Sequence, residues 1–374
     1  MPFSTPSQVL LRHGLRSASK FCTRRFTVAK VPCAADALYK AAVCVQLGAP
    51  LQVQQRPYPS QLNANEVLIS THAVGINFAD ILMCKGQYQD RRRTPFTPGT
   101  EISGKVVEVG TGVSRIKTGD RVIALDFAQS GGASELFVAP AKAVFPIPDH
   151  LGFVEAAATI VSYSTAMLAL SRKAQLKKGN ERVLITAAAG ATGLAAVDIA
   201  KNLFDCEVIA ICGGADKCAF LKERGAQHTI DYTQEKIRDR VKEITQGAGV
   251  NVVMDHVGGD TLLECVKSLG FEGRALTIGY AGGSIPNIPA NQLLLKSSSL
   301  IGMFWGSYAT LNPAAFAGSI RQVLEAIEAR QLHPYVGKTF ALDQINEAFQ
   351  YILERKSIGK VVIKIKEESP SSKL

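Results

Sequence analysis

The stretch Val183-Leu-Ile-Thr-Ala-Ala-Ala-Gly-Ala-Thr-Gly193 joins a short apolar run to a segment with helical spacing. A glycine-rich turn that follows a strand and opens a helix lets the backbone approach a pyrophosphate, whose charge then sits at the helix N-terminus. Ala188 stands where a strict G-x-G-x-x-G motif has its first glycine, whereas Gly190 and Gly193 keep the other two positions. The stretch predicts a dinucleotide site or, as the alternative, a tight turn without a ligand.

The chain downstream of this turn alternates short apolar runs with helical segments. Such repetition predicts an α/β fold with a parallel sheet wound on both faces. The expected strands are residues 183–186, 207–212, 250–255, 274–278 and 296–306, and the expected helices are 192–204, 216–224, 234–245 and 260–269.

The chain upstream of the turn has a different texture, with short strands separated by glycine and proline. This spacing is typical of a β-rich, partly barrel-like unit. An alanine-rich helical run follows, and the segment 313–366 is expected to add helices and a last strand that returns to the first domain. The expected strands are residues 39–45, 66–73, 101–109, 121–125, 134–140 and 360–365, and the helical run is 155–170.

Composition narrows the class of protein. The 374 residues are 47% hydrophobic and 20% charged, which excludes wholesale disorder. The longest apolar stretch, 183–200, is interrupted by threonine, glycine and aspartate, so no membrane span is expected. The net charge is +10, but the first 35 residues hold six basic and no acidic residues. The remaining +4 gives little reason to expect a nucleic-acid partner.

Cysteine usage indicates a reducing compartment. The eight cysteines are scattered, and no pair has C-x-x-C spacing. A disulfide framework is therefore not expected. Cys206, Cys212 and Cys218 repeat by six, which suits no zinc ribbon and favours ordinary packing on a strand and its flanks.

The residues after the second expected strand bear on the cofactor. An NAD-preferring site places a carboxylate at the end of this strand to bind the ribose 2′-hydroxyl. Here Cys212 is followed by Gly-Gly-Ala-Asp-Lys217, so no carboxylate ends the strand and Lys217 lies within reach of a 2′-phosphate. Asp216 is interpreted as a helix N-cap rather than a ribose ligand. The pattern favours NADPH over NADH.

Several further segments share the motifs of one family, in the same order along the chain. They are Val74-Gly-Ile-Asn77-Phe-Ala-Asp80 through Gly86-Gln-Tyr88, Pro98-Gly-Thr-Glu101-Ile-Ser-Gly104, Gly119-Asp-Arg-Val122, Gly131-Gly-Ala-Ser-Glu135, Ala156-Ala-Ala-Thr-Ile-Val-Ser-Tyr-Ser-Thr165-Ala166, the glycine turn, and Asp255-His-Val-Gly-Gly259. With these segments, the chain resembles the zinc-independent quinone oxidoreductases, the ζ-crystallin-like branch of the medium-chain dehydrogenase/reductase superfamily. The resemblance covers roughly residues 37–365.

The resemblance implies a discontinuous GroES-like catalytic domain (37–162 and 306–366) and a Rossmann domain (163–305), preceded by a basic extension (1–36) and followed by a polar tail (367–374). By motif position it implies catalytic roles for Asn77 and Thr165 near the nicotinamide and for Tyr88 near the substrate. A second tyrosine found in some relatives corresponds to Leu82, which implies a more apolar pocket. The implied cofactor residues are Ala188, Gly190, Ala191, Thr192, Gly193, Lys217, Tyr232, Val257, Ile278, Gly279, Tyr280, Phe304, Trp305 and Gly306.

A zinc site is not expected. Zinc alcohol dehydrogenases use cysteine and histidine ligands, whereas Asn77 and Thr100 stand at the equivalent places. Glu101 is then interpreted as a structural hydrogen-bonding residue, and His72 and His256 as histidines of the core. Without a metal or a clear general acid, hydride donation to an electron-poor acceptor is favoured over alcohol oxidation.

Two functions follow as hypotheses. The first is an NADPH-dependent reductase of quinones or α,β-unsaturated carbonyls, with a small electrophilic substrate and a homodimer or homotetramer as the expected assembly. The second is a non-catalytic NADPH-binding protein with a single-stranded RNA partner, which the lack of a basic stripe interleaved with aromatics disfavours. Arg91-Arg92-Arg93 is either a solvated loop or a grip for an acidic substrate.

The two ends of the sequence carry conflicting addresses. Residues 1–35 have the composition of a mitochondrial presequence, or of an ordinary basic tail. Ser372-Lys373-Leu374 matches the S-K-L peroxisomal signal. A peroxisomal or mitochondrial location, or both, is expected.

Overall fold

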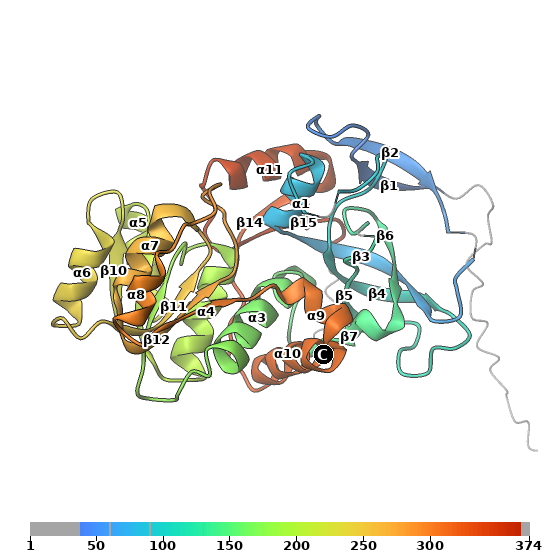
Figure 1. Cartoon of the computed structure of the whole chain (residues 1–374). Coiled ribbons are helices and arrows are strands. Elements are labelled where there is room, and N and C mark those ends of the chain that lie inside the picture. Colours follow the sequence, from blue (N-terminus) through green and yellow to red (C-terminus); the bar gives the residue numbers. More distant parts are fainter. Residues whose placement is uncertain (1–37, 60, 90, 130, 368–374) are drawn as a thin grey trace, which may run out of the picture. The chain divides into compact units, whose positions relative to one another are not determined.

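The computed structural model describes residues 38–59, 61–89, 91–129 and 131–367 (Figure 1). Both expected targeting segments, residues 1–35 and 372–374, lie outside these ranges. In the described part of the chain, no helix combines the length and the apolar character needed to cross a membrane.

The glycine turn belongs to a six-stranded sheet in which every neighbouring pair is parallel. Its order is β10-β9-β8-β11-β12-β13, which in chain order reads 3-2-1-4-5-6, the arrangement of a dinucleotide-binding Rossmann sheet. The predicted doubly wound α/β fold is confirmed. The strands are β8 (Arg182–Ile185), β9 (Glu207–Cys212), β10 (His228–Asp231), β11 (Val250–Asp255), β12 (Leu269–Thr277) and β13 (Ser299–Gly302).

The side chains of each strand point alternately to the two faces of this sheet, and each face has its own hydrophobic core. In β9, Val208 and Ala210 pack with α4 on one face, whereas Ile209 packs with α6 and α7 on the other. Successive strand side chains point to opposite faces, so both faces need an apolar covering. The covering helices are α4 (Ala191–Asn202), α5 (Ala215–Glu223), α6 (Ile237–Ile244), α7 (Gly259–Lys267) and α8 (Ala290–Leu294).

The β-rich part is a seven-stranded sheet of order β14-β15-β3-β4-β5-β7, with β6 on β3, beside a two-stranded β1-β2 sheet. Strand β15, near the end of the chain, pairs antiparallel with β3. The strands are β1 (Leu38–Val43), β2 (Gln52–Pro57), β3 (Glu66–Ile76), β4 (Glu101–Val109), β5 (Arg121–Leu125), β6 (Leu136–Pro140), β7 (Val144–Pro146), β14 (Val336–Ala341) and β15 (Lys360–Lys364), and helices α1 (Phe78–Cys84) and α11 (Ile345–Leu353) accompany them.

Two expectations from sequence are wrong in detail. The predicted helix 155–170 is divided into α2 (Phe153–Ala156), α3 (Ile160–Met167) and a π-helical turn (Leu168–Lys173). The predicted strand 296–306 contracts to β13 and is followed by α9 (Trp305–Leu311), because the Trp305 indole turns into the core and stacks on Phe316 with ring centroids 4.5 Å apart.

Helix α10 (Pro313–Glu328) was expected with the β-rich domain but packs on α3. Its buried side chains Phe316, Ile320 and Val323 share a core with α4 and the face of the parallel sheet that α4 covers. The contribution of the C-terminal region to the β-rich sheet therefore begins at β14, since the apolar stripe of α10 is already buried elsewhere.

Candidate active site

The cofactor residues expected from sequence gather at one edge of the parallel sheet. Each segment begins within five residues after a strand end: β8 is followed by 188–193, β9 by Lys217, β10 by Tyr232, β11 by Val257, β12 by 278–280 and β13 by 304–306. In open α/β sheets, ligands bind at the carboxyl ends of the strands, where the strand order reverses. Here that point lies between β8 and β11.

The glycine turn opens α4 with small residues that the geometry requires. Gly190 is the N-cap of α4, and a Cβ on Gly193 would lie 2.3 Å from the Ala187 carbonyl oxygen. The first N–H groups of a helix have no intrahelical acceptor, so those at the start of α4, in the segment Ala191–Gly193, are positioned to bind an anion. The turn fits a pyrophosphate.

The end of β9 brings together Lys217 and Tyr232. The Tyr232 side chain is 48% exposed, and its ring lies so close to Gly213 that a Cβ there would be 2.9 Å from Cζ of the ring. Lys217 is half-buried on α5, where burial lowers the pKa of its ammonium, and its Nζ donates to the Arg355 carbonyl oxygen at 2.6 Å. Lys217 and Tyr232 therefore both lie at the turn that follows β9.

Sequence reasoning missed a carboxylate beside this turn. Asp231 ends β10 in register with Cys212, and its Oδ1 accepts hydrogen bonds from the Gly214 N–H at 3.0 Å and from the Thr233 hydroxyl at 2.7 Å. These bonds lower the pKa of Asp231. This carboxylate could have been found from the sequence by examining the last residue of the next strand, β10.

The nicotinamide side of the candidate site comes from β11, β12 and β13. Ile278 donates its backbone N–H to the Asp255 carbonyl oxygen at 2.8 Å, which holds the 278–280 segment next to Val257. Phe304 is 49% exposed, whereas Trp305 is buried, and its indole N–H donates to the Ser319 hydroxyl at 3.0 Å. The Trp305 side chain therefore packs in the hydrophobic core beside the candidate site.

Asn77 lies in a buried polar cluster that sequence reasoning identified only in part. Its amide nitrogen donates to Glu101 Oε1 at 2.9 Å, and its amide oxygen accepts from Lys360 Nζ at 2.7 Å. Lys360 also forms an ion pair with Glu101, and both side chains are 1% exposed. Glu101 Oε2 accepts the Val161 N–H at 2.8 Å. The two hydrogen bonds of the Asn77 amide, to Glu101 and from Lys360, fix its orientation.

A second carboxylate completes this cluster without joining the ion pair. Asp80 accepts hydrogen bonds from the Thr100 hydroxyl at 2.9 Å and from the Asn77 backbone N–H at 2.8 Å. Complete burial raises the pKa of Asp80. These bonds tie the N-terminus of α1 to the start of β4.

The residues at the zinc position do not fit zinc. Thr100 donates its hydroxyl hydrogen to Asp80, and Glu101 is paired with the Lys360 ammonium. Zinc sites in proteins take thiolate, imidazole and carboxylate ligands, and a neighbouring ammonium opposes a cation. Across the described ranges, no group of three or more histidine, cysteine, aspartate or glutamate side chains is placed to hold a metal ion.

The last strand joins the polar cluster to the glycine turn. Gly359 donates its N–H to the Ala189 carbonyl oxygen at 2.8 Å and forms a bridge with Gly190, and the next residue is Lys360. Gly359 has φ +65°, a conformation that favours glycine. Asn77 and the glycine turn are therefore linked through two consecutive residues, Gly359 and Lys360.

The other two expected catalytic residues, Thr165 and Tyr88, come from α3 and from the loop after α1. Thr165 is buried, and Tyr88 is half-buried.

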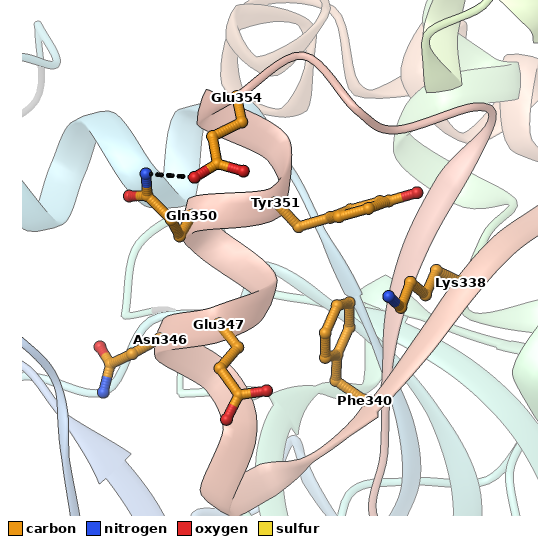
Figure 2. Close-up of a pocket in the computed structure, with 7 residues that line it drawn as sticks. All are labelled: Lys338, Phe340, Asn346, Glu347, Gln350, Tyr351 and Glu354. Carbon is orange, nitrogen blue, oxygen red and sulfur yellow. Dashed lines mark hydrogen bonds between the residues drawn. The ribbon is translucent and has the colours of Figure 1, made fainter.

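A surface pocket elsewhere, on β14 and α11, is lined by Lys338, Phe340 and Tyr351 together with polar side chains (Figure 2). It contains none of the expected site residues.

The fold and these site features define a two-part dehydrogenase/reductase of the medium-chain type. Residues 63–149 match the model of the alcohol dehydrogenase GroES-like domain, and residues 191–325 match that of a zinc-binding dehydrogenase.

Full-length relatives narrow the class. A quinone oxidoreductase-like protein 2 homologue from Nematostella vectensis is 45% identical over 366 residues, which cover 98% of this chain and 99% of that protein. The quinone oxidoreductase of Thermus thermophilus, solved also with NADPH, is 33% identical with TM-score 0.75 over 87% of this chain and 100% of that one. A mycobacterial protein complexed with NADPH is 30% identical with TM-score 0.79 over 87% and 99%. The chain belongs to the quinone oxidoreductase-like, zinc-independent branch of the medium-chain dehydrogenases/reductases.

Proposed function

We propose that this protein is an NADPH-dependent, zinc-independent reductase that transfers hydride to a quinone or an α,β-unsaturated carbonyl compound. The observation that carries the proposal is the Asn77–Glu101–Lys360 cluster, which stands at the position of a zinc site and is linked through Gly359 to a pyrophosphate-binding turn. Relatives named quinone oxidoreductase and neighbours solved with NADPH support it.

Binding of the dinucleotide is assigned to the carboxyl edge of the parallel sheet. The start of α4 would hold the pyrophosphate through backbone N–H groups. Lys217 would leave the Arg355 carbonyl oxygen for the 2′-phosphate, which offers it a full charge in place of a neutral acceptor. Tyr232 would cover the adenosine side.

NADPH supplies the hydride when it is bound. Asn77, locked by Glu101 and Lys360, keeps one amide hydrogen unused by these bonds and would donate it to the acceptor oxygen or the nicotinamide amide. A fixed donor of this kind orients an acceptor and stabilises developing negative charge without reorganising. An electron-poor acceptor requires less acid assistance than a simple carbonyl, which favours quinones and enones.

The test is NADPH oxidation, followed by absorbance, against a panel of quinones and enones, with cofactor binding measured separately by fluorescence. Turnover of a panel member with NADPH, and weaker turnover with NADH, is expected. If NADPH binds and nothing in the panel is reduced, the reductase assignment is wrong. The alternative function, a non-catalytic NADPH-binding protein, would then be favoured.

The protein is further proposed to be a homo-oligomer. Strand β13 is an edge of the parallel sheet, and Leu294 and Leu295, which precede it in the chain at the end of α8, are 78% and 77% exposed. An open strand edge and exposed apolar side chains both favour pairing with another copy of the chain.

A further inference from the structure

Two thiols meet at the turn that follows β9. Cys212 is the last residue of β9 and is 3% exposed, whereas Cys218 is half-buried in the first turn of α5. Their Sγ atoms are 3.2 Å apart. Disulfide-bonded sulfurs lie about 2.0 Å apart, so a movement of about 1.2 Å would bring these atoms to bonding distance.

The same turn carries the residues proposed to bind the 2′-phosphate. Gly213 and Gly214 lie between the two cysteines in sequence, and Lys217 directly precedes Cys218. The Tyr232 ring lies against Gly213, and the Gly214 N–H donates to Asp231. A change in the distance between the two sulfurs would therefore move groups that contact the cofactor.

We propose that Cys212 and Cys218 form a reversible disulfide that weakens the binding of NADPH. The effect on the cofactor rests on the proposed function, whereas formation of the disulfide does not. Cys206 and Cys212 lie in the hydrophobic core and Cys218 packs against it, as expected from sequence, and the proposed disulfide would be a role in addition to this packing.

A peroxide is the oxidant class that suits the site. It reaches the more exposed Cys218 first and converts its thiol to a sulfenic acid, releasing one water. The Cys212 sulfur then attacks the Cys218 sulfur: the S–S bond forms, the S–O bond breaks, and the hydroxyl leaves as a second water with the proton of Cys212. The two thiols lose two electrons and two protons, and the peroxide accepts both. Burial raises the pKa of the Cys212 thiol and keeps it protonated before the reaction, so the closeness of the two sulfurs, and not a reactive thiolate at Cys212, is what favours the second step.

The disulfide would act on NADPH more than on NADH. Forming the bond draws the first turn of α5 toward β9, and Lys217 moves with that turn. Because NADH has no 2′-phosphate, a displaced Lys217 costs it little.

The experiment uses the full chain in a Cys22→Ser/Cys33→Ser background, which removes thiols outside the described residues. Hydrogen peroxide treatment should lower the intact mass by two hydrogen atoms, and a non-reducing peptide map should join Cys212 to Cys218. The Kd for NADPH, from fluorescence titration, should rise about tenfold while that for NADH changes little, and dithiothreitol should reverse both effects. Cys218→Ser should abolish the peroxide effect, whereas Ala219→Ser, which adds a hydroxyl on the exposed side of the same helix, should behave like the parent.

Each contrary outcome has its own meaning. Oxidation elsewhere in the chain without a 212–218 link overturns the disulfide, and a link that leaves the Kd for NADPH unchanged overturns its effect on the cofactor. If the reduced protein fails to bind NADPH, the proposed cofactor is wrong, while the peptide map still decides whether the pair forms.

Discussion

Lys217 carries the proposed preference for NADPH. Replacing it with glutamate places a carboxylate where the 2′-phosphate is expected, so Lys217→Glu should raise the Kd for NADPH by about 10- to 100-fold and alter that for NADH far less. Titration of both cofactors measures this. Lys222→Glu, an exposed position on the same helix, makes the same charge change as a control. An equal loss for both cofactors in the Lys217 variant would place this residue away from the 2′-phosphate.

The Lys360–Glu101 pair makes a prediction about stability. Lys360→Met leaves the Glu101 carboxylate buried without its partner, which should lower the free energy of unfolding by about 3–5 kcal/mol. The double variant Lys360→Met/Glu101→Gln removes both charges and should recover much of that loss. Denaturant unfolding of the wild type, both single variants and the double variant gives the coupling energy, and a coupling near zero would contradict the assigned pair.

His256 gives the protein a defined pH dependence. Its Nδ1 donates to the Thr186 carbonyl oxygen at 2.9 Å, Nε2 is buried, and burial lowers the pKa of the imidazole. In the unfolded chain the His256 imidazole binds a proton at about pH 6.5, whereas in the folded protein it stays neutral to a lower pH. The free energy of unfolding therefore falls as the pH drops below about 6.5, by up to about 1.4 kcal/mol per pH unit.

The check is to compare unfolding free energies at pH 7.5 and 5.5. His256→Asn should show a smaller loss at pH 5.5 than the wild type, whereas the exposed His333→Asn should keep the wild-type profile. A steeper loss in His256→Asn than in the wild type would reverse the sign assigned to this group.

Among the elements, α4 depends on the absence of a side chain at its first turn. Gly193→Ala would place a Cβ 2.3 Å from the Ala187 carbonyl oxygen, so the helix must move away from the turn. We expect about 1–3 kcal/mol less stability, together with weaker binding of both NADPH and NADH. Gly318→Ala in α10 is the control, because no atom lies within 4 Å of its Cβ, and alanine there should stabilise by about 0.5–1 kcal/mol. Cofactor binding unchanged in Gly193→Ala would argue against a pyrophosphate at this turn.

For the whole molecule, the exposed leucines at the end of α8, which precede β13 in the chain, predict the assembly. Leu294→Glu/Leu295→Glu puts two charges on the proposed contact and should convert an oligomer to a monomer without unfolding, since neither side chain is buried in the described structure. Light scattering after size exclusion measures the mass. Leu311→Glu on α9, where leucine is 83% exposed, is the control and should leave the mass unchanged. A wild-type protein that is monomeric at micromolar concentration would exclude this assembly.

What the sequence alone determined is mostly local. The period of two in the strands, the glycine turn before α4 and the absence of a carboxylate at the end of β9 can each be read within about a dozen residues. The structure confirms the α/β fold that the strand pattern and the turn predict. The placement of α10 and the shortening of β13 could not be read in this way, because the contact of Trp305 with Phe316 depends on how α9 and α10 pack together.

What only the tertiary structure decided is the partner of each buried polar group. Glu101 and Lys360 are 259 residues apart in the sequence, and nothing local to either residue indicates the other. Their contact depends on β15 pairing with β3 in one register, just as the meeting of Cys212 with Cys218 depends on how α5 packs against β9. Hydrophobic periodicity shows which face of an element is buried. The identity of the groups that face each other there is set by strand register and helix packing, because a shift of one residue turns every side chain to the opposite face.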